Sequence, residues 1–199
     1  GKDSVITIGC VSQDFLTETS NRCAAAFCLQ NASAPDAVSF KSERELLLAF
    51  AQHVRDTDPD VIVGYNTFGF DWYYLRERMR EIRKLNLLTD DDINLVQSTG
   101  RSRDEVCPVE DHRYATSAMG ENLHRYARHV GRIEIDLLWH VRKQFKLDSY
   151  KLDFVAWSFT GDKKIDLPPK KIFEYFITGD RERGEIATYC LQDCDLVHK

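Results

Sequence analysis

DPDVIVGYNTFGFD, residues 58–71, is the most informative stretch of the sequence. The run Val61–Gly64 is apolar without polar alternation, as is typical of a strand that is buried on both faces. An apolar pattern at helical spacing follows Asp71 and comprises Leu75, Met79 and Ile82. Ligands of open α/β sheets bind where such a strand ends and a helix begins. The stretch therefore predicts a buried strand, a loop placed to carry a site, and a helix.

The segments before this stretch predict two strands and a helix. Residues 5–11 and 24–29 are rich in apolar residues and are expected to pair as a hairpin. Ser42 and Glu45 match a capping box, and apolar residues follow at helical spacing. Pro59 disfavours the helical conformation in the residue before it, so this helix should end just ahead of the stretch.

The segments after the stretch predict a further strand and several helices. Residues 131–136 alternate in polarity as a strand does and lead into a helix at 137–145. Helices are also expected around 150–159 and 170–177, and from 181 to the end. Residues 88–122 show little periodicity and are interpreted as a loop-rich insertion at the surface. This mixture of strands and helices predicts an α/β fold.

The composition excludes several classes of protein. With 43% hydrophobic and 30% charged residues, the 199-residue chain resembles a globular domain rather than a disordered or collagenous one. A formal net charge of −5 argues against a protein that coats phosphate groups non-specifically. The cysteines and histidines show no zinc-ligand spacing, and no apolar run approaches the ~20 residues that cross a bilayer. Scattered cysteines and the lack of a signal peptide favour an intracellular location.

The loop before the second helix holds the first candidate residues. Asn66 offers both a hydrogen-bond donor and an acceptor, and Gly64 and Gly69 allow backbone turns. Asp71 is either a functional carboxylate or simply the N-cap of the following helix.

The last predicted helix holds the second candidates. Tyr189 and Asp193 lie one turn apart on one face. The carboxylate could hold a divalent cation while the phenol orients a water molecule. The alternative is a solvent-facing Asp beside a half-buried Tyr, with Cys190 and Cys194 as ordinary core contacts.

Two other patterns have structural interpretations. The basic residues of 76–84 are either a solvated helix face with ion pairs or a basic track beside an acidic metal site. His124 and His129 lack a matching carboxylate or cysteine cluster and are expected to be surface or packing residues.

The two candidate groups, in this order, resemble the 3′→5′ exonuclease domain of family B DNA polymerases. Residues 58–71 are similar to its second exonuclease motif, and residues 189–193, YCLQD, to the third, of form Y-x-x-x-D. Between them, residues 131–138, GRIEIDLL, resemble the family's strand-to-helix segment, and residues 146–152, KLDSYKL, its K-L-x-S-Y-x-L signature.

The two ends of the chain extend this resemblance. Residues 2–8 resemble the strand that follows the family's first motif. The nearest type is delta-like, while residues 166–173 and 192–197 are most similar to versions from large DNA viruses.

The resemblance implies a role for each candidate residue. Asp71 and Asp193 would be ligands of Mg²⁺, with two ions in the complete site and Mn²⁺ as a substitute. Tyr189 would orient the attacking water, and Asn66 and Phe70 would help to place a frayed single-stranded 3′ end. We assign Asp136 to supporting the fold.

The resemblance also implies a ribonuclease-H-like mixed sheet flanked by helices, lacking its first strand in this chain. The family's first motif, Asp-x-Glu on that strand, is not found. Residues 1–199 are therefore expected to be one exonuclease segment of a longer DNA polymerase, weak or inactive alone. Two alternatives stay open: a stand-alone nuclease of the Asp-Glu-Asp-Asp group, and a catalytically degenerate interaction module.

The implied partners are the 3′ end of single-stranded DNA, primer-template DNA, the remaining polymerase domains and a processivity factor. No membrane partner is expected. The implied location is the nucleus or a viral replication site in a host cell.

Overall fold

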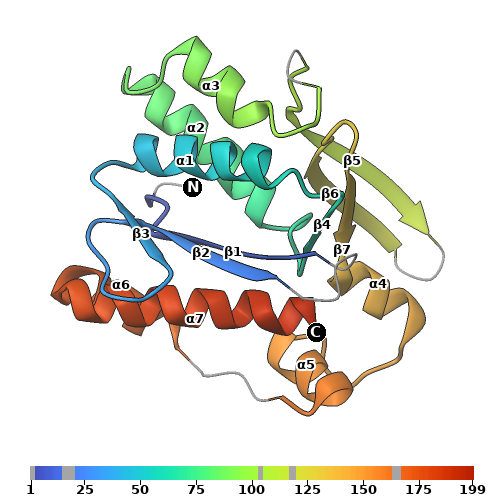
Figure 1. The fold of residues 1–199 in the computed structure, drawn as a ribbon. Helices are drawn as coiled ribbons and strands as arrows, with labels where there is room; N and C mark the ends of the chain where they lie inside the picture. Colours follow the sequence, from blue (N-terminus) through green and yellow to red (C-terminus); the bar gives the residue numbers. More distant parts are fainter. Residues whose placement is uncertain (1–2, 15–20, 103–104, 117–119, 163–166) are drawn as a thin grey trace. The chain divides into compact units, whose positions relative to one another are not determined.

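A computed structural model describes residues 3–14, 21–102, 105–116, 120–162 and 167–199 (Figure 1). Lys2 and Asp166, which belong to stretches that support the resemblance, lie outside these residues. The chain divides into two compact units, and the boundary between them falls inside helix α1. The first unit comprises residues 1–4 and 51–143, and the second comprises residues 5–50 and 144–199.

The second unit contains a three-stranded sheet in the order β1-β2-β3. The strands are β1 (Thr7–Gln13), β2 (Arg22–Leu29) and β3 (Ala37–Phe40). β1 and β2 pair antiparallel, which confirms the predicted hairpin, and β2 pairs parallel to β3, a strand that the sequence did not predict.

Three helices complete the second unit: α5 (Leu152–Thr160), α6 (Pro169–Thr178) and α7 (Asp180–His198). All three were predicted to within a few residues. α7 packs along β1 and β2 (Figure 1), and small side chains allow this close approach. A core cluster joins the sheet to this helix and consists of Ala26, Cys28, Ala187 and Leu191.

Helix α1 (Glu43–Thr57) begins and ends where the sequence predicts. Ser42 Oγ accepts a hydrogen bond from the backbone N–H of Glu45 at 3.2 Å. The Glu45 carboxylate accepts from the backbone of Lys41 at 3.0 Å, one residue before the position that a capping box uses. The predicted apolar positions are all buried, namely Leu46, Leu47, Phe50 and Val54.

In the first unit, β4 (Val61–Gly64) pairs parallel with β7 (Ile133–Asp136). Helix α2 (Asp71–Lys84) follows β4, and helix α4 (Leu137–Gln144) follows β7 directly. The prediction that β4 is buried on both faces is wrong, because the side chains of Val61 and Val63 are exposed. β4 has only β7 as a partner among the described strands, so the face that carries these two valines is not covered.

The structure differs from the prediction of a loop-rich insertion over residues 88–122. This region contains α3 (Asp90–Gln97), strand β5 (Val109–Thr116) and the start of strand β6 (Gly120–Ala127), which pairs antiparallel with β5. A reciprocal capping box between Thr89 and Asp92 starts α3. Residues 103–104 and 117–119 of this region lie outside the described residues.

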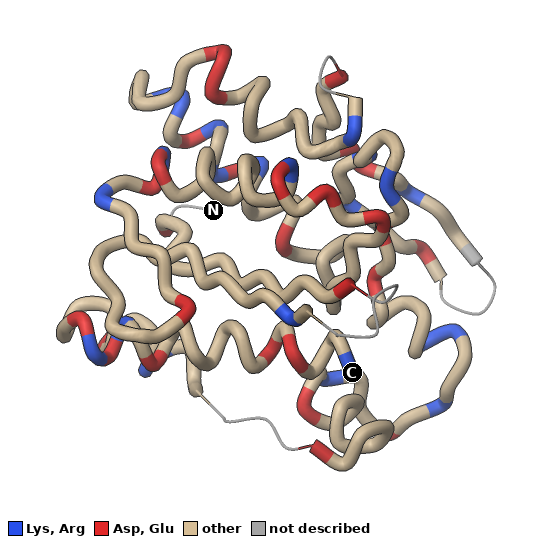
Figure 2. Tube along the Cα trace, in the orientation of Figure 1, with Lys and Arg blue, Asp and Glu red and all other residues tan. Residues whose placement is uncertain are grey.

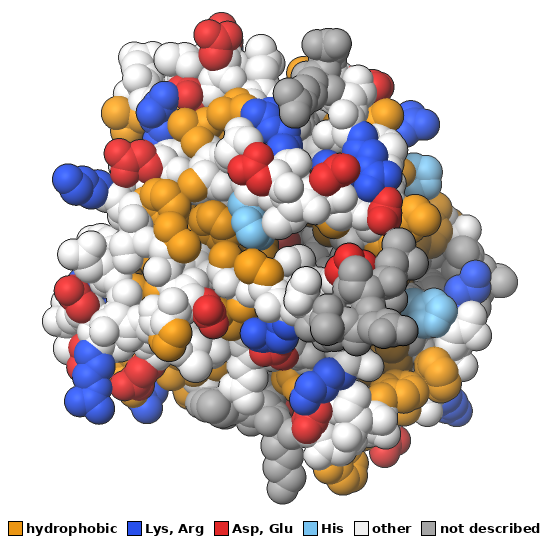
Figure 3. Space-filling model, viewed as in Figure 1, with side chains coloured by type: hydrophobic (Ala, Val, Ile, Leu, Met, Phe, Trp, Pro, Cys, Tyr) orange, Lys and Arg blue, Asp and Glu red, His pale blue; other side chains and the backbone are white. Residues whose placement is uncertain are grey.

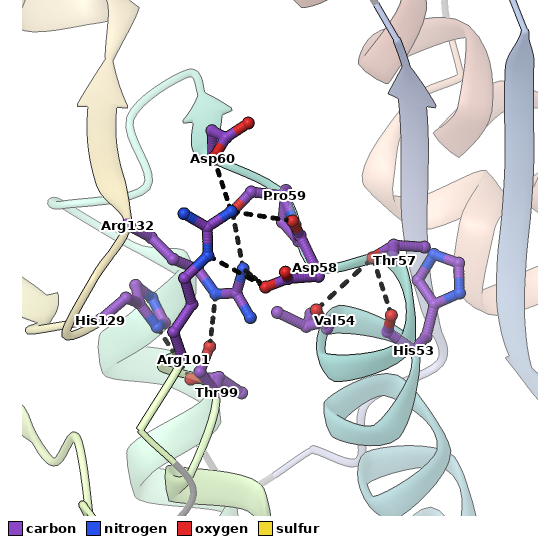
Figure 4. A network of polar contacts seen from close by, with 10 residues as sticks. All are labelled: His53, Val54, Thr57, Asp58, Pro59, Asp60, Thr99, Arg101, His129 and Arg132. Atoms are coloured by element: carbon purple, nitrogen blue, oxygen red, sulfur yellow. Dashed lines mark hydrogen bonds and ion pairs between the residues drawn. The ribbon is translucent and has the colours of Figure 1, made fainter.

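Two arginines, Arg101 within this region and Arg132 after β6, bind the turn after α1 (Figure 4). Arg132 has a side chain that is only 1% exposed, and it donates to Asp58 Oδ1 at 2.7 Å and to the backbone carbonyl of Thr99 at 2.8 Å. Arg101 donates to Asp58 Oδ1 at 3.1 Å and to Asp60 Oδ1 at 2.5 Å. The hydrogen bonds that Asp58 accepts, first from Arg101 and then from Arg132, lower its pKa.

The described architecture is therefore mixed α/β, as predicted. Of the helices that the structure describes, none combines the length and apolar character needed to cross a membrane.

Candidate functional site

The carboxylate of Asp136 organises the loop between β4 and α2. Asp136 ends β7 and is 4% exposed. Its Oδ1 accepts from the backbone N–H groups of Asn66 at 2.8 Å and Leu138 at 3.0 Å, and its Oδ2 accepts from that of Phe68 at 3.0 Å. Parallel pairing of Gly64 with Asp136 places this carboxylate directly beside the loop. The position fits the support role that we assigned to Asp136.

Asn66 makes the sharp turn in this loop. Its φ of 65° is in the left-handed region, and its carbonyl accepts from the backbone N–H groups of Gly69 and Phe70, both at 3.0 Å. Gly64 and Gly69 do not adopt the left-handed conformation, although Gly69 closes the turn that begins at Asn66. A Cβ at Gly64 would overlap the side chain of Thr67, and a Cβ at Gly69 would overlap the end of the Asn66 side chain.

Phe70 and Asp71 stand at the start of α2. Phe70 is exposed, and its ring stacks on Tyr74 with centroids 5.4 Å apart. Phe70 is also the N-cap residue and makes no side-chain cap, so the alternative that Asp71 is the N-cap is wrong. Asp71 is the first residue of the helix, near the positive end of the helix dipole.

The Asp71 carboxylate is crowded by protein although part of the residue surface is exposed. Desolvation raises its pKa from 3.8 to about 6, and the negative charge of Asp136 adds to this shift. A bound divalent cation would stabilise the ionised carboxylate of Asp71 and so oppose both the desolvation and the repulsion from Asp136. The carboxylate therefore suits a hard cation that prefers oxygen ligands.

Next to this loop lies a chain of buried polar residues that the sequence did not reveal. Glu134, two residues before Asp136 on β7, accepts a hydrogen bond from the indole N–H of Trp72. Its Oε2 lies 3.9 Å from His129 Nε2, and His129 Nδ1 pairs with Thr99 Oγ1 at 2.8 Å. Desolvation raises the pKa of Glu134 to about 8 and lowers that of His129 to about 4.

Tyr189 and Asp193 lie on α7 in the second unit, and both are half-buried. Cys190 next to them packs on Gly9, where a Cβ would lie 2.8 Å from the Cys190 sulfur. Burial raises the pKa of the nearby Cys10 thiol to about 12, so this thiol stays protonated. These contacts confirm that the cysteines of α7 are packing residues.

The predicted site residues therefore fall into two sets. Asn66, Phe70 and Asp71 are adjacent in the first unit, and Tyr189 and Asp193 are one helical turn apart in the second. Within the described part of the chain, no group of three or more His, Cys, Asp or Glu side chains could hold a metal ion. The assignment of Asp71 and Asp193 as metal ligands stays a prediction.

The basic residues of α2 form ion pairs, which favours the structural interpretation of residues 76–84. Arg80 pairs with Glu77 at 2.7 Å and Lys84 with Glu81 at 2.6 Å, each three residues apart. Basic and acidic residues are interspersed along the trace (Figure 2) and on the molecular face drawn in Figure 3. His124 packs on Trp139, as expected, whereas His129 is buried beside a carboxylate, that of Glu134, which the sequence did not predict.

Comparison with known proteins bears on the first set of residues. The family model described as "DNA polymerase family B, exonuclease domain" matches residues 1–155. This range includes Asn66, Phe70 and Asp71, whereas Tyr189 and Asp193 lie beyond it.

Individual relatives are polymerase catalytic subunits of two kinds. The chain is 32% identical over 161 residues to the DNA polymerase delta catalytic subunit of rice, which covers 81% of the chain and 14% of the relative. It is 34% identical over 165 residues to the DNA polymerase catalytic subunit of varicella-zoster virus (strain Dumas), which covers 83% of the chain and 13% of the relative. Gallid herpesvirus 2 has a similar subunit, 32% identical over 165 residues.

The chain thus spans about one seventh of the length of these relatives. The delta-like and viral resemblance is confirmed, and the mixed α/β fold agrees with the ribonuclease-H-like class. The chain belongs to the exonuclease domain family of family B DNA polymerases.

Proposed function

We propose that this chain is the proofreading segment of a longer replicative DNA polymerase, and that it removes nucleotides from the 3′ end of single-stranded DNA. The observation that carries the proposal is the loop of residues 66–71. The Asp136 carboxylate fixes its backbone through two hydrogen bonds, from the N–H groups of Asn66 and Phe68, so Asp71 is presented at a helix start in a constant position. Preorganised groups of this kind are what phosphodiester hydrolysis requires.

Exonuclease domains of this family generally use divalent metal ions. Bound Mg²⁺ ions would supply a hydroxide near neutral pH and stabilise the departing 3′ oxygen. In this chain, Asp71 and Asp193 would hold them. The raised pKa of Asp71 supports this assignment, because a desolvated carboxylate beside Asp136 gains from a nearby cation.

The other residues would position the substrate. Asn66 keeps its side chain at the turn of the loop, where the amide can donate to or accept from a nucleotide. Phe70 exposes an aromatic ring already stacked on Tyr74, and an unpaired base could extend this stack. Tyr189 lies one turn from Asp193 on α7 and could orient the attacking water through its phenol.

The partners and location of the parent protein follow from the same proposal. They are the single-stranded 3′ end, primer-template DNA, the other polymerase domains and a processivity factor. The parent would act in the nucleus or at a viral replication site.

A metal-binding experiment tests the site assignment on the chain itself. We expect weak Mn²⁺ binding by calorimetry, since the chain supplies two of the four carboxylates of the family pattern. The variant Asp71→Asn should lose the binding, while Asp91→Asn, which removes an exposed carboxylate from α3, should keep it. Equal binding by both variants would overturn the role of Asp71.

A nuclease assay tests the expected activity of the isolated chain. A 3′-labelled single strand should be hydrolysed very slowly in Mg²⁺. Rapid hydrolysis that Asp71→Ala abolishes would contradict the expected weak activity, although it would leave the site assignment intact.

A further inference from the structure

The first unit contains a cavity that the proposed metal site does not use. It has a volume of about 490 Å³ and lies between the β5–β6 hairpin, the loop of Phe68 and strand β7. The backbone N–H of Arg125 on β6 donates to the carbonyl of Phe68 at 2.8 Å, which ties the hairpin to the loop beside the cavity. Asp71 is not among the residues that line it.

One side of the cavity is a wall of aromatic rings. The Phe68 ring lies 5.4 Å from that of Tyr126 and 5.5 Å from that of His124. Tyr114 packs edge-on against His124 at 4.7 Å, and a 2.8 Å hydrogen bond joins its hydroxyl oxygen and His124 Nε2. The ring planes are inclined by 45–75° to one another, so a flat aromatic ligand can stack on one of these rings at a time.

Two buried polar atoms of the cavity lining lack a hydrogen-bond partner in the described structure: Glu134 Oε2 and His129 Nε2. Their side chains are only 9% and 1% exposed. The opposite atoms of both groups are fixed, since Glu134 Oε1 accepts from Trp72 and His129 Nδ1 pairs with Thr99. Buried polar atoms without partners are costly, so a ligand that pairs with both would bind favourably.

The chemistry of these two atoms suits the edge of a nucleobase. They lie 3.9 Å apart, too far for a hydrogen bond to each other. Nucleobases carry donors and acceptors on neighbouring atoms of a flat ring, so one base edge can bond to both atoms while the ring stacks.

An unpaired cation lies at the edge of the cavity. Arg128 lines it and is exposed, and its side chain makes no ion pair or hydrogen bond within the described residues. Arg132, which also lines the cavity, is already bound to Asp58, Pro59 and Thr99. Arg128 is therefore the residue placed to bind a phosphate.

We propose that this cavity binds a single nucleotide, with the base edge at Glu134 and His129, the ring on the aromatic wall and the phosphate at Arg128. The ligand is either a free nucleoside monophosphate or one nucleotide of a single strand. The site shares no residue with the proposed metal site, so each stands or falls without the other.

Tryptophan fluorescence of the 199-residue chain tests the proposal. Trp72 bonds to Glu134, and the Trp139 ring lies 4.3 Å from that of His124, so both report on the cavity. Deoxyadenosine monophosphate, a four-nucleotide single strand and deoxyribose 5-phosphate are titrated without divalent ions, which prevents hydrolysis. At least one of the two nucleotide ligands should give a saturable change in fluorescence. The ligand that binds more tightly shows whether the cavity takes a free monophosphate or a nucleotide of a single strand. Deoxyribose 5-phosphate should bind at least about tenfold more weakly because it lacks the base.

Matched variants distinguish binding in the cavity from non-specific binding to the hairpin. Arg128→Ala should weaken nucleotide binding about tenfold, whereas Arg113→Ala, which removes an exposed arginine of the same hairpin outside the cavity, should change it less than twofold. Glu134→Gln should reduce the preference for the nucleotide over deoxyribose 5-phosphate. The proposal is overturned if neither nucleotide ligand saturates, if the sugar phosphate binds equally well, or if the two arginine variants behave alike.

Discussion

Replacing Glu134 by glutamine is expected to stabilise the protein, and increasingly so as the pH rises. The Glu134 side chain is 9% exposed, and its Oε1 accepts from Trp72. Glutamine keeps the shape and the carbonyl acceptor, and it removes only the ability to ionise. The variant therefore isolates the free energy of keeping a carboxyl group at this buried position.

The size of the effect follows from the pKa, which burial raises from 4.5 to about 8. Because the pKa is higher in the folded state, the folded protein keeps a proton that the unfolded chain releases. The stability of the wild type is thus full below about pH 4.5 and falls as the pH rises to about 8. At about 1.36 kcal/mol per pKa unit, the loss is about 3 kcal/mol at pH 7 and at most about 5 kcal/mol above pH 8.

Urea unfolding in a Trp157→Phe background, followed by the fluorescence of Trp72 and Trp139, measures this difference in the first unit. Because Asp71 and His129 have shifted pKa values as well, the informative quantity is the variant's unfolding free energy minus that of the wild type. We expect less than about 0.5 kcal/mol at pH 4.5 and about 3 kcal/mol at pH 7. A difference that does not change with pH, or a variant less stable at pH 8, would refute the reasoning.

Three further perturbations have defined outcomes. Arg132→Met should lower the unfolding free energy by about 3 kcal/mol, because it leaves the part-buried carbonyls of Pro59 and Thr99 without a donor. Arg101→Met, at a side chain 39% exposed, should lower it far less in the same urea titration. Gly69→Ala should cost at most about 1 kcal/mol, because its Cβ would overlap only the end of the exposed Asn66 side chain, which can rotate away; a larger drop in the free energy of unfolding would contradict this. The Mn²⁺ affinity measured by calorimetry should be about tenfold lower at pH 5 than at pH 7, because protons compete with the metal for Asp71, whose pKa is about 6. Equal affinities at the two pH values would exclude that carboxylate as a ligand.

The elements that could be predicted are those with a strong local signal. β4 follows from an apolar run and a proline before it, α1 from Ser42 and its apolar face, and α7 from a long helical pattern. The wrong prediction for β4 concerns its burial, which depends on neighbouring strands. An apolar run cannot tell how many neighbours a strand has, and Val61 and Val63 are exposed because β7 is its only described partner.

The β5–β6 hairpin could not be predicted because its strands are polar. β5 reads VEDHRYAT, and such a strand has no apolar face to detect. Its pairing with β6 is supported by contacts between residues opposite or nearly opposite, such as Tyr114 with His124. α3 was missed for a similar reason, because three consecutive aspartates at its start were interpreted as a loop.

In the candidate site too, residues with a local sequence signal could be predicted and residues defined by distant partners could not. Asn66, Phe70 and Asp71 could be proposed because they are consecutive in a recognisable stretch. Glu134 and His129 could not, since their properties come from burial and from partners such as Trp72 and Thr99 that are distant in sequence. The left-handed conformation of Asn66 could not be predicted, because glycine is the usual residue at such a position and two glycines stand beside it.

Excision of a mismatched 3′-terminal nucleotide by the full-length parent polymerase tests the central claim most directly. Asp71→Ala and Asp193→Ala should each reduce the excision rate by at least about a hundredfold in Mg²⁺ while primer extension continues at its normal rate. Mismatch excision at the wild-type rate in either variant would contradict the assignment of that carboxylate to the metal site.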